Sequence, residues 1–156
     1  CSSDLVTRET CTNEVYVSCP GLAYQIECNE VSHKILTSSS MCKLMVLGSI
    51  KLLQKISVEM ACSHSHSIES RLARWIITRQ DIEKSKTIKT THQFIANSMG
   101  VRRESITNAS AKLKGLKIFR GLIEIQERAL LEAQCCECYF LDKTTHLQQS
   151  NLAFYA

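Results

Sequence analysis

The stretch that decides the fold is residues 91–125, THQFIANSMGVRRESITNASAKLKGLKIFRGLIEI. Two short amphipathic segments flank Gly100, with apolar residues at helical spacing before it and again over residues 103–113. A glycine at this point allows a tight turn that a larger side chain would strain. Ala96 is small enough for two helices to cross closely at a steep angle. The pattern predicts a helix-turn-helix, a motif whose second helix can enter the major groove of DNA.

A small hairpin is predicted directly after this motif. Residues 116–119 and 122–125 read as two short strands, and Arg120-Gly121 between them is typical of a tight hairpin turn. Residues 127 to about 138 return to a helical pattern. Together these elements predict a winged helix-turn-helix.

The basic side chains gather on the same stretch. The formal net charge is +4, but residues 100–121 hold six basic side chains against the single acid Glu104. Residues 122–142 hold five acids against Arg128 alone, and residues 1–40 are also acidic. This distribution indicates a face that binds a polyanion. An ordinary solvated surface is the alternative reading.

A long helix is expected over residues 41–61, after a run of serines that offers N-cap residues. Its apolar residues widen to two sides, so one side is free to meet a second copy of the chain. A helix packed wholly within its own monomer is the alternative. The expected dimer interface consists of Leu44, Met45, Gly48, Leu52 and Ile56.

The remaining segments predict the domain organisation. Residues 12–35 read as strands, and because the chain starts at Cys1 in strand-like sequence we expect an amino-terminal truncation. Cys62 to His66 read as a polar hinge before a helix of residues 68–80 that Ser67 caps, and residues 81–90 read as a polar linker. The expected domains are a truncated effector remnant (1–37), a dimerisation helix with hinge (38–66), a DNA-binding domain (67–143) and a tail (144–156).

Nine cysteines, an odd number without a repeating spacing, do not suggest a disulfide framework. Most are expected to be small buried or half-buried residues in a reducing cytoplasm. The best metal-like group is Cys135, Cys136 and Cys138 with His146. On a helix, however, such thiols would point to different sides, so we predict neither a metal site nor a cofactor. No catalytic motif is found, and no catalytic residue or enzymatic activity is predicted.

The order of these elements resembles the Crp/Fnr family of bacterial transcription regulators. Three stretches carry the resemblance: HSIESRLARWI (66–76), HQFIANSMGVRRESIT (92–107) and LLEAQCCECY (130–139). The resemblance implies a mainly α fold with small β elements. In it, a winged helix-turn-helix follows a long dimerisation helix and the end of a β-roll of the cyclic-nucleotide-binding type.

The resemblance also implies which residues meet DNA. The pair Arg103-Glu104 stands where the family's recognition helix contacts bases, in keeping with arginine pairing to guanine and glutamate accepting from cytosine. Asn108 stands where many members have a second arginine, and it suits adenine better. The expected base contacts are Arg103, Glu104, Thr107 and Asn108. The expected phosphate contacts are Thr91, Gln93, Arg102, Lys112, Lys117 and Arg120.

The family's effector site requires an arginine and a Gly-Glu pair in the β-roll. Arg8 is the only arginine before residue 71 and no Gly-Glu pair accompanies it, so we do not expect this chain to bind a cyclic nucleotide.

The sequence therefore predicts a cytoplasmic, sequence-specific regulator without a membrane segment, which binds double-stranded DNA at a palindrome as a homodimer. RNA polymerase is a further expected partner. The alternative is a protein-interaction or dimerisation module with a retained winged helix and no effector binding. A ligand- or redox-sensing module that uses the cysteine cluster is a third alternative.

Overall fold

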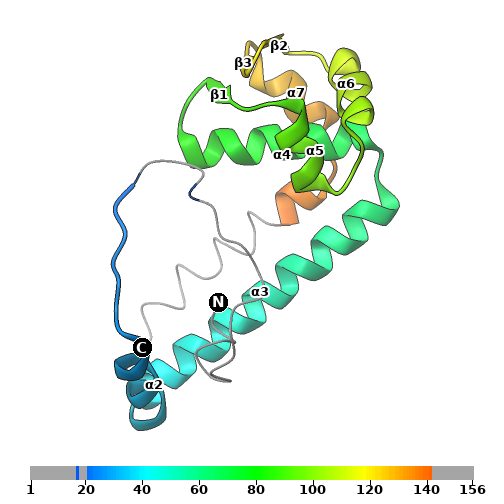
Figure 1. Cartoon of the computed structure of the whole chain (residues 1–156). Helices are drawn as coiled ribbons and strands as arrows, with labels where there is room; N and C mark the ends of the chain where they lie inside the picture. Colours follow the sequence, from blue (N-terminus) through cyan, green and yellow to red (C-terminus); the bar gives the residue numbers. More distant parts are fainter. Residues whose placement is uncertain (1–16, 18–20, 142–156) are drawn as a thin grey trace. The chain divides into compact units, whose positions relative to one another are not determined.

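The computed structural model describes residue 17 and residues 21–141, which fall into two compact units that meet between Ser57 and Val58. Figure 1 shows the helices and strands of each unit. The predicted fold class is confirmed for its helical part and its wing: a long helix precedes a helix-turn-helix with a small antiparallel sheet. The predicted domain boundaries stay predictions.

The first unit is helical in its described part. Residues 21–27 have no regular structure, and α2 (Cys28–Thr37) follows, so the strands predicted over 22–35 are wrong. Alternating side chains form a strand only where another strand offers its hydrogen bonds, and the described residues of this unit contain none. The strand expected from residue 12 falls mostly on residues outside the described part of the chain.

Helix α3 (Ser39–Ser65) is longer than the predicted helix of residues 41–61. The Ser38 hydroxyl accepts a hydrogen bond from the Met41 amide at 3.4 Å, so the predicted serine cap is confirmed. At the other end the helix continues through Cys62, and the polar hinge is confined to His66 and Ser67 before the next helix. No single helix of the described chain is long and apolar enough to cross a membrane; α2 and α3 reach that composition only as a pair bent by 107°.

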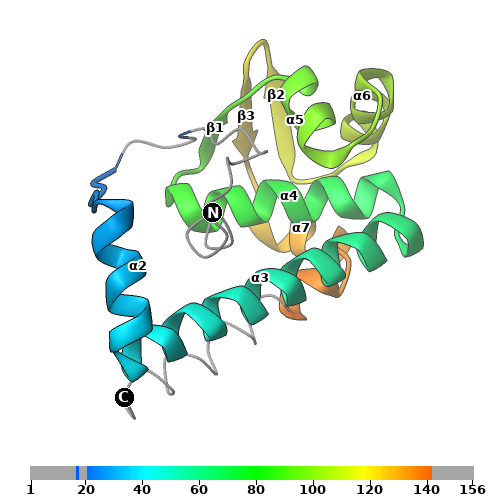
Figure 2. The ribbon, with the colours of Figure 1, turned by 60° about the horizontal axis from the view of Figure 1, so that its bottom comes forward.

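The second unit contains α4 (Ile68–Glu83), β1 (Thr87–Lys89), α5 (His92–Met99), α6 (Arg103–Lys112), β2 (Leu116–Phe119), β3 (Leu122–Ile125) and α7 (Arg128–Gln134). The two hairpin strands have the predicted bounds. The sequence does not predict strand β1, which lies within the expected linker. Ile88 is its only buried residue, and three residues are too few to show an alternation of apolar and polar side chains. All neighbours in the sheet are antiparallel, in the order β1-β3-β2 (Figure 2).

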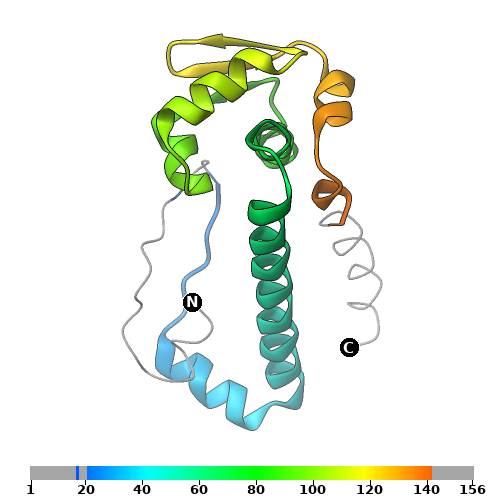
Figure 3. The same cartoon turned by 90° about the vertical axis from the view of Figure 1, so that its right-hand side faces the viewer.

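Helix α4 forms the centre of this unit. Its Leu72, Ala73, Ile76 and Ile77 are fully buried, and the predicted cap Ser67 accepts from the Ser70 amide at 3.2 Å. Viewed along α4, the helices α5 and α6 lie on one side and α7 on the other (Figure 3). The core therefore holds α6 directly against α4, and α5 against α6.

The turn between α5 and α6 matches its prediction. Gly100 ends α5 with φ of 65°, in the left-handed region, and the Val101 amide then donates to the Ala96 carbonyl at 3.0 Å. Ala96 is fully buried at this crossing. After α6, Gly115 has φ of 85°, and a Cβ there would lie 2.5 Å from the Glu127 carbonyl oxygen, so only glycine fits.

Candidate nucleic-acid interface

Helix α6 has one face in the core and one face in solvent. Ile106, Ala109 and Ser110 are buried against the rest of the second unit. Arg103, Glu104, Thr107 and Asn108 are all exposed. Residues four apart lie on one side of a helix, so the pairs 103/107 and 104/108 present a continuous surface. The predicted base-contacting residues thus share the solvent-facing side of a well-anchored helix.

Among the predicted base-contacting residues, Arg103, Glu104 and Asn108 are available to a partner. The described part of the chain provides no side-chain hydrogen bond or ion pair to any of the three. Arginine and asparagine side chains can each make two hydrogen bonds to one base edge, and glutamate can accept from a base amino group. These side chains can therefore bond a ligand without first breaking a hydrogen bond or ion pair to the described part of the chain.

Thr107 differs from its neighbours because its hydroxyl already has two partners. It donates to the Arg103 carbonyl oxygen at 3.1 Å and lies 3.0 Å from Nδ1 of His92 on α5. A hydroxyl has one proton, so the His92 Nδ1–H is the donor in the second bond. The sequence reasoning missed this link between α5 and α6. Thr107 is left with its methyl group as its main free contact surface.

The start of α5 offers backbone donors. Thr91 caps the helix, as expected for Thr90 or Thr91, and its hydroxyl oxygen accepts from the Phe94 amide at 3.1 Å. The remaining first-turn amides and the helix dipole favour an anion in front of this end. The Gln93 side-chain amide donates to Asn97 at 2.8 Å along the exposed side of the helix. Thr91 and Gln93, which are both predicted to contact phosphate, are exposed.

The predicted cationic contacts surround α6. Arg102, Lys117 and Arg120 are exposed, on the N-cap of α6, on β2 and at the hairpin turn. Lys112 instead has a partner, because its ammonium group donates to the Glu69 carboxylate at 2.7 Å. This hydrogen bond lowers the pKa of Glu69. Exposed ion pairs are weak, so a phosphate can compete for Lys112.

A polar network behind the interface fixes the helices, and the sequence reasoning did not find it. Arg71 on α4 donates to the Met99 carbonyl at the end of α5, at 3.0 Å. On the other side of α4, Arg128 donates to Gln80 at 2.9 Å and to the Tyr139 hydroxyl at 2.6 Å. These contacts join residues far apart in sequence, so no local pattern could have shown them.

The predicted dimer residues lie on α3. Leu44 is 61% exposed, Leu52 and Ile56 are also exposed, and Met45 is half-buried. Gly48 has no neighbouring atom within 4 Å of the place a Cβ would take. The structure contains one chain, so the assignment of these residues to a dimer stays a prediction.

The cysteines are arranged differently from the prediction. Helix α7 ends at Gln134, before Cys135, so the argument that a helix would scatter these thiols does not hold. Cys136 and Cys138 lie with Cys62 and His66, and the ligand atoms of these four residues are within 4.8 Å of one another. Cys135 is not in the group, and burial raises the pKa of its thiol to about 12. Cys42, expected to be at least half-buried, is exposed. His146 is outside the described residues.

The second unit is similar to domains of known proteins. Residues 70–134, from α4 to the end of α7, match a family model described as the Crp-like helix-turn-helix domain. A solved structure from Eubacterium rectale, assigned to the Crp/Fnr family of transcriptional regulators, is similar with a TM-score of 0.60 and 23% identity. The match covers 69% of this chain and 51% of that one, so the chain spans about half the length of that relative. No curated protein matches the chain.

Proposed function

We propose that the chain, whose residues 70–134 match a Crp-like helix-turn-helix domain, acts as a sequence-specific regulator of transcription that binds double-stranded DNA through the major groove. In this proposal α6 enters the groove. Arg103, Glu104 and Asn108 contact base edges, and Thr107 contributes its methyl group. The backbone of the DNA meets the predicted phosphate-contacting residues, which are Thr91, Gln93, Arg102, Lys112, Lys117 and Arg120.

One observation carries this proposal. The exposed side of α6 holds polar side chains that are able to bond bases and have no partner among the described residues, while the opposite side of α6 is buried. The cations beside this face supply the attraction to phosphate that positions the helix.

We propose further that two copies associate through α3. Among its exposed apolar side chains, Leu44, Leu52 and Ile56 recur at intervals of four and eight residues, a spacing that keeps these three near one side of a helix. The α3 helix of a second copy is the partner that matches this surface, because it presents the same apolar side chains. A two-fold dimer would then place its recognition helices one helical turn of DNA apart, about 34 Å, on a palindrome.

Selection of duplexes from a random pool by the purified chain tests the proposal. We expect enrichment of a palindrome whose half-sites are separated by one helical turn or a multiple of it. The matched control is Arg103→Lys, which keeps the charge and removes the planar fork. It should still bind duplexes while losing the preference at one position of each half-site.

Three results would contradict parts of the proposal. Absence of any enriched sequence, together with capture of other proteins through the winged helix, would favour the protein-interaction module. Enrichment of a single, unrepeated half-site would leave the DNA contact in place and remove the dimer. An unchanged motif with the Arg103→Lys variant would exclude base contact by Arg103.

A further inference from the structure

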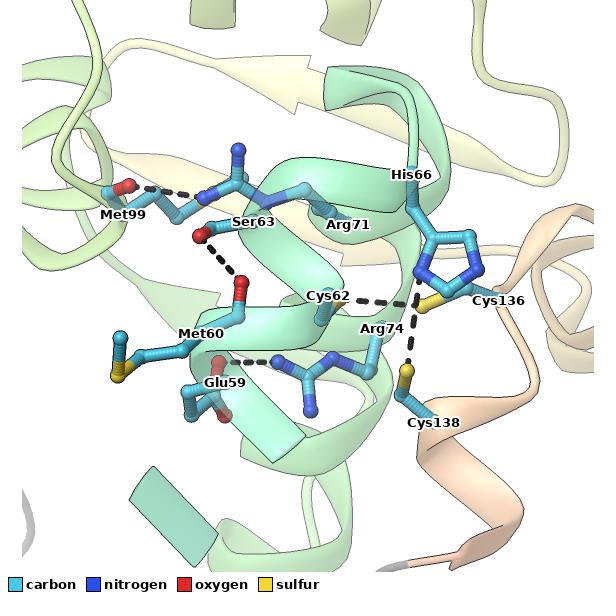
Figure 4. Close-up of polar contacts among 10 residues, drawn as sticks. All are labelled: Glu59, Met60, Cys62, Ser63, His66, Arg71, Arg74, Met99, Cys136 and Cys138. Carbon is cyan, nitrogen blue, oxygen red and sulfur yellow. Dashed lines mark hydrogen bonds and ion pairs between the residues drawn. The ribbon is translucent and has the colours of Figure 1, made fainter. Parts of the chain in front are cut away.

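Four side chains with metal-binding atoms converge in the second unit, as Figure 4 shows. They are Cys62, His66, Cys136 and Cys138. The Sγ atoms of Cys62 and Cys136 are 3.6 Å apart, and the Sγ atom of Cys138 is 3.7 Å from Nδ1 of His66. The three cysteines are at most 5% exposed. A group of three buried thiols beside a half-buried imidazole is unusual for a packing role, because aliphatic side chains would fill the space as well.

The spacing of these atoms fits one tetrahedral ion. With zinc–sulfur bonds of about 2.3 Å and zinc–nitrogen bonds of about 2.0–2.1 Å, a tetrahedron places two sulfurs about 3.8 Å apart and a sulfur about 3.6 Å from a nitrogen. The Cys62–Cys136 and Cys138–His66 separations of 3.6 Å and 3.7 Å are within about 0.2 Å of these values, and all four ligand atoms lie within 4.8 Å of one another. An iron–sulfur cluster needs room for several iron and sulfide atoms between its thiolates, which this spacing does not give.

We propose that Cys62, His66, Cys136 and Cys138 bind a structural zinc ion. Four protein ligands of the Cys₃His type complete the coordination and leave no open position, as in structural rather than catalytic zinc sites. On binding, the thiols lose their protons to solvent, and the ion takes thiolates and the neutral imidazole as ligands.

The local backbone explains why the ligands meet. Cys62 and His66 are four residues apart, and the His66 amide donates to the Cys62 carbonyl at 3.1 Å, so the last helical turn brings both side chains to one side. The chain beyond α7 turns at Glu137 and becomes helical again over residues 138–141, which places Cys136 and Cys138 opposite this turn. Each segment thus supplies one pair of ligands.

A carboxylate contact to His66 supports the assignment independently. The Nε2 atom of His66 is 3.0 Å from Oε1 of Glu137, while Nδ1 faces Cys138. Histidines that ligate a metal usually donate their other ring N–H to a carboxylate, which fixes the tautomer and the ring orientation. Glu137 fixes His66 in this way and leaves the Nδ1 lone pair free for the ion.

The surrounding charge is also suitable. Three thiolates and a divalent cation carry one net negative charge, and the buried guanidinium of Arg74 acts electrostatically on the Cys62 and Cys136 thiols. Arg74 is itself anchored by a hydrogen bond to Glu59 on α3. The site therefore has a cation close to its excess negative charge.

The position of the site indicates its role. It joins the end of α3 to the segment after α7, across 74 residues of sequence. The next residue, Tyr139, is buried and bonds to Asp81 of α4 at 2.7 Å. Zinc would hold this closing segment in place and with it the contacts behind the helix-turn-helix.

The test uses the full chain purified under reducing conditions without chelator, with zinc and iron measured per chain by mass spectrometry. We expect one zinc per chain and no iron. Replacement of zinc by Co²⁺ should give the visible absorption of tetrahedral cobalt with thiolate ligands. Two matched pairs of variants locate the site. Cys136→Ser and His66→Ala should lose the ion and the cobalt spectrum, whereas Cys135→Ser and His64→Ala should keep both.

A further variant separates ligation from folding. Glu137→Gln should still fold and bind cobalt, with an affinity lower by roughly 10–100-fold. If Cys136→Ser does not fold, chelation of the wild type followed by cobalt titration still measures stoichiometry and geometry. A chain that binds no zinc or cobalt overturns the proposal. Iron found together with labile sulfide would also overturn it, as would a disulfide between these cysteines in the reduced preparation. Equal loss of bound metal from the ligand variant and from its matched control would overturn it too. None of these readouts depends on DNA binding.

Discussion

Replacement of Arg103 by alanine is expected to remove one base contact from each half-site and nothing else. The side chain is exposed in the first turn of α6 and has no hydrogen bond or ion pair among the described residues, so the folded state loses no internal contact. Stability should change by less than about 0.5 kcal/mol. A bidentate arginine–guanine pair contributes about 1–3 kcal/mol to discrimination, which corresponds to about 5- to 150-fold in affinity per half-site.

Titration of labelled duplexes measures this effect. The preferred duplex and a set with one base pair changed in each half-site are compared for the wild type and for Arg103→Ala. The variant should bind the preferred duplex more weakly and lose its preference at one base pair only. Arg120→Ala, at the hairpin turn, is the control and should weaken all duplexes about equally. A uniform loss by the Arg103 variant across unrelated sequences would refute its role in base recognition.

Three other changes test separate parts of the account. Leu52→Glu puts a charge on the apolar side of α3 and should raise the dimer dissociation constant in analytical ultracentrifugation; a wild type that is monomeric at micromolar concentration would contradict the dimer. Glu69→Gln releases Lys112 from its ion pair and should raise affinity for all duplexes by a few-fold in the same titration, and an unchanged affinity would show that Lys112 does not meet phosphate. Gly115→Ala places a Cβ against the Glu127 carbonyl and an alanine in the left-handed region, so the free energy of unfolding should fall by at least about 1–3 kcal/mol. The melting temperature should fall accordingly, and an unchanged melting temperature would contradict this geometry.

The helix-turn-helix and the hairpin were predictable because local chemistry determines them. Gly100 and Gly121 both adopt positive φ, Thr91 and Ser67 cap their helices, and the strand bounds agree with the predicted ones. Each of these features depends on residues a few positions apart. The exposed set on α6 follows from the same helical periodicity.

The errors arose where distant residues decide the structure. Residues 22–26 alternate like a strand, but a strand needs a neighbour, which the described part of the first unit does not supply. Strand β1 exists only because β3 pairs with it. The cluster of Cys62 and His66 with two cysteines beyond α7 combines segments that sequence reasoning treated separately. A signal was present in the C-x₃-H and C-x-C spacings, since each can place two ligands together.

The salt dependence of binding to a duplex of random sequence tests the central claim most directly. The four predicted cationic contacts are Arg102, Lys112, Lys117 and Arg120, which gives eight in a dimer. Counterion release then predicts a slope of about −7 for log K against log salt concentration, or about −4 for a monomer. A slope of that size supports DNA binding through this face, and Arg120→Ala should reduce its magnitude by roughly one unit per subunit. A binding constant that does not change with salt, or no binding at low salt, would contradict the account.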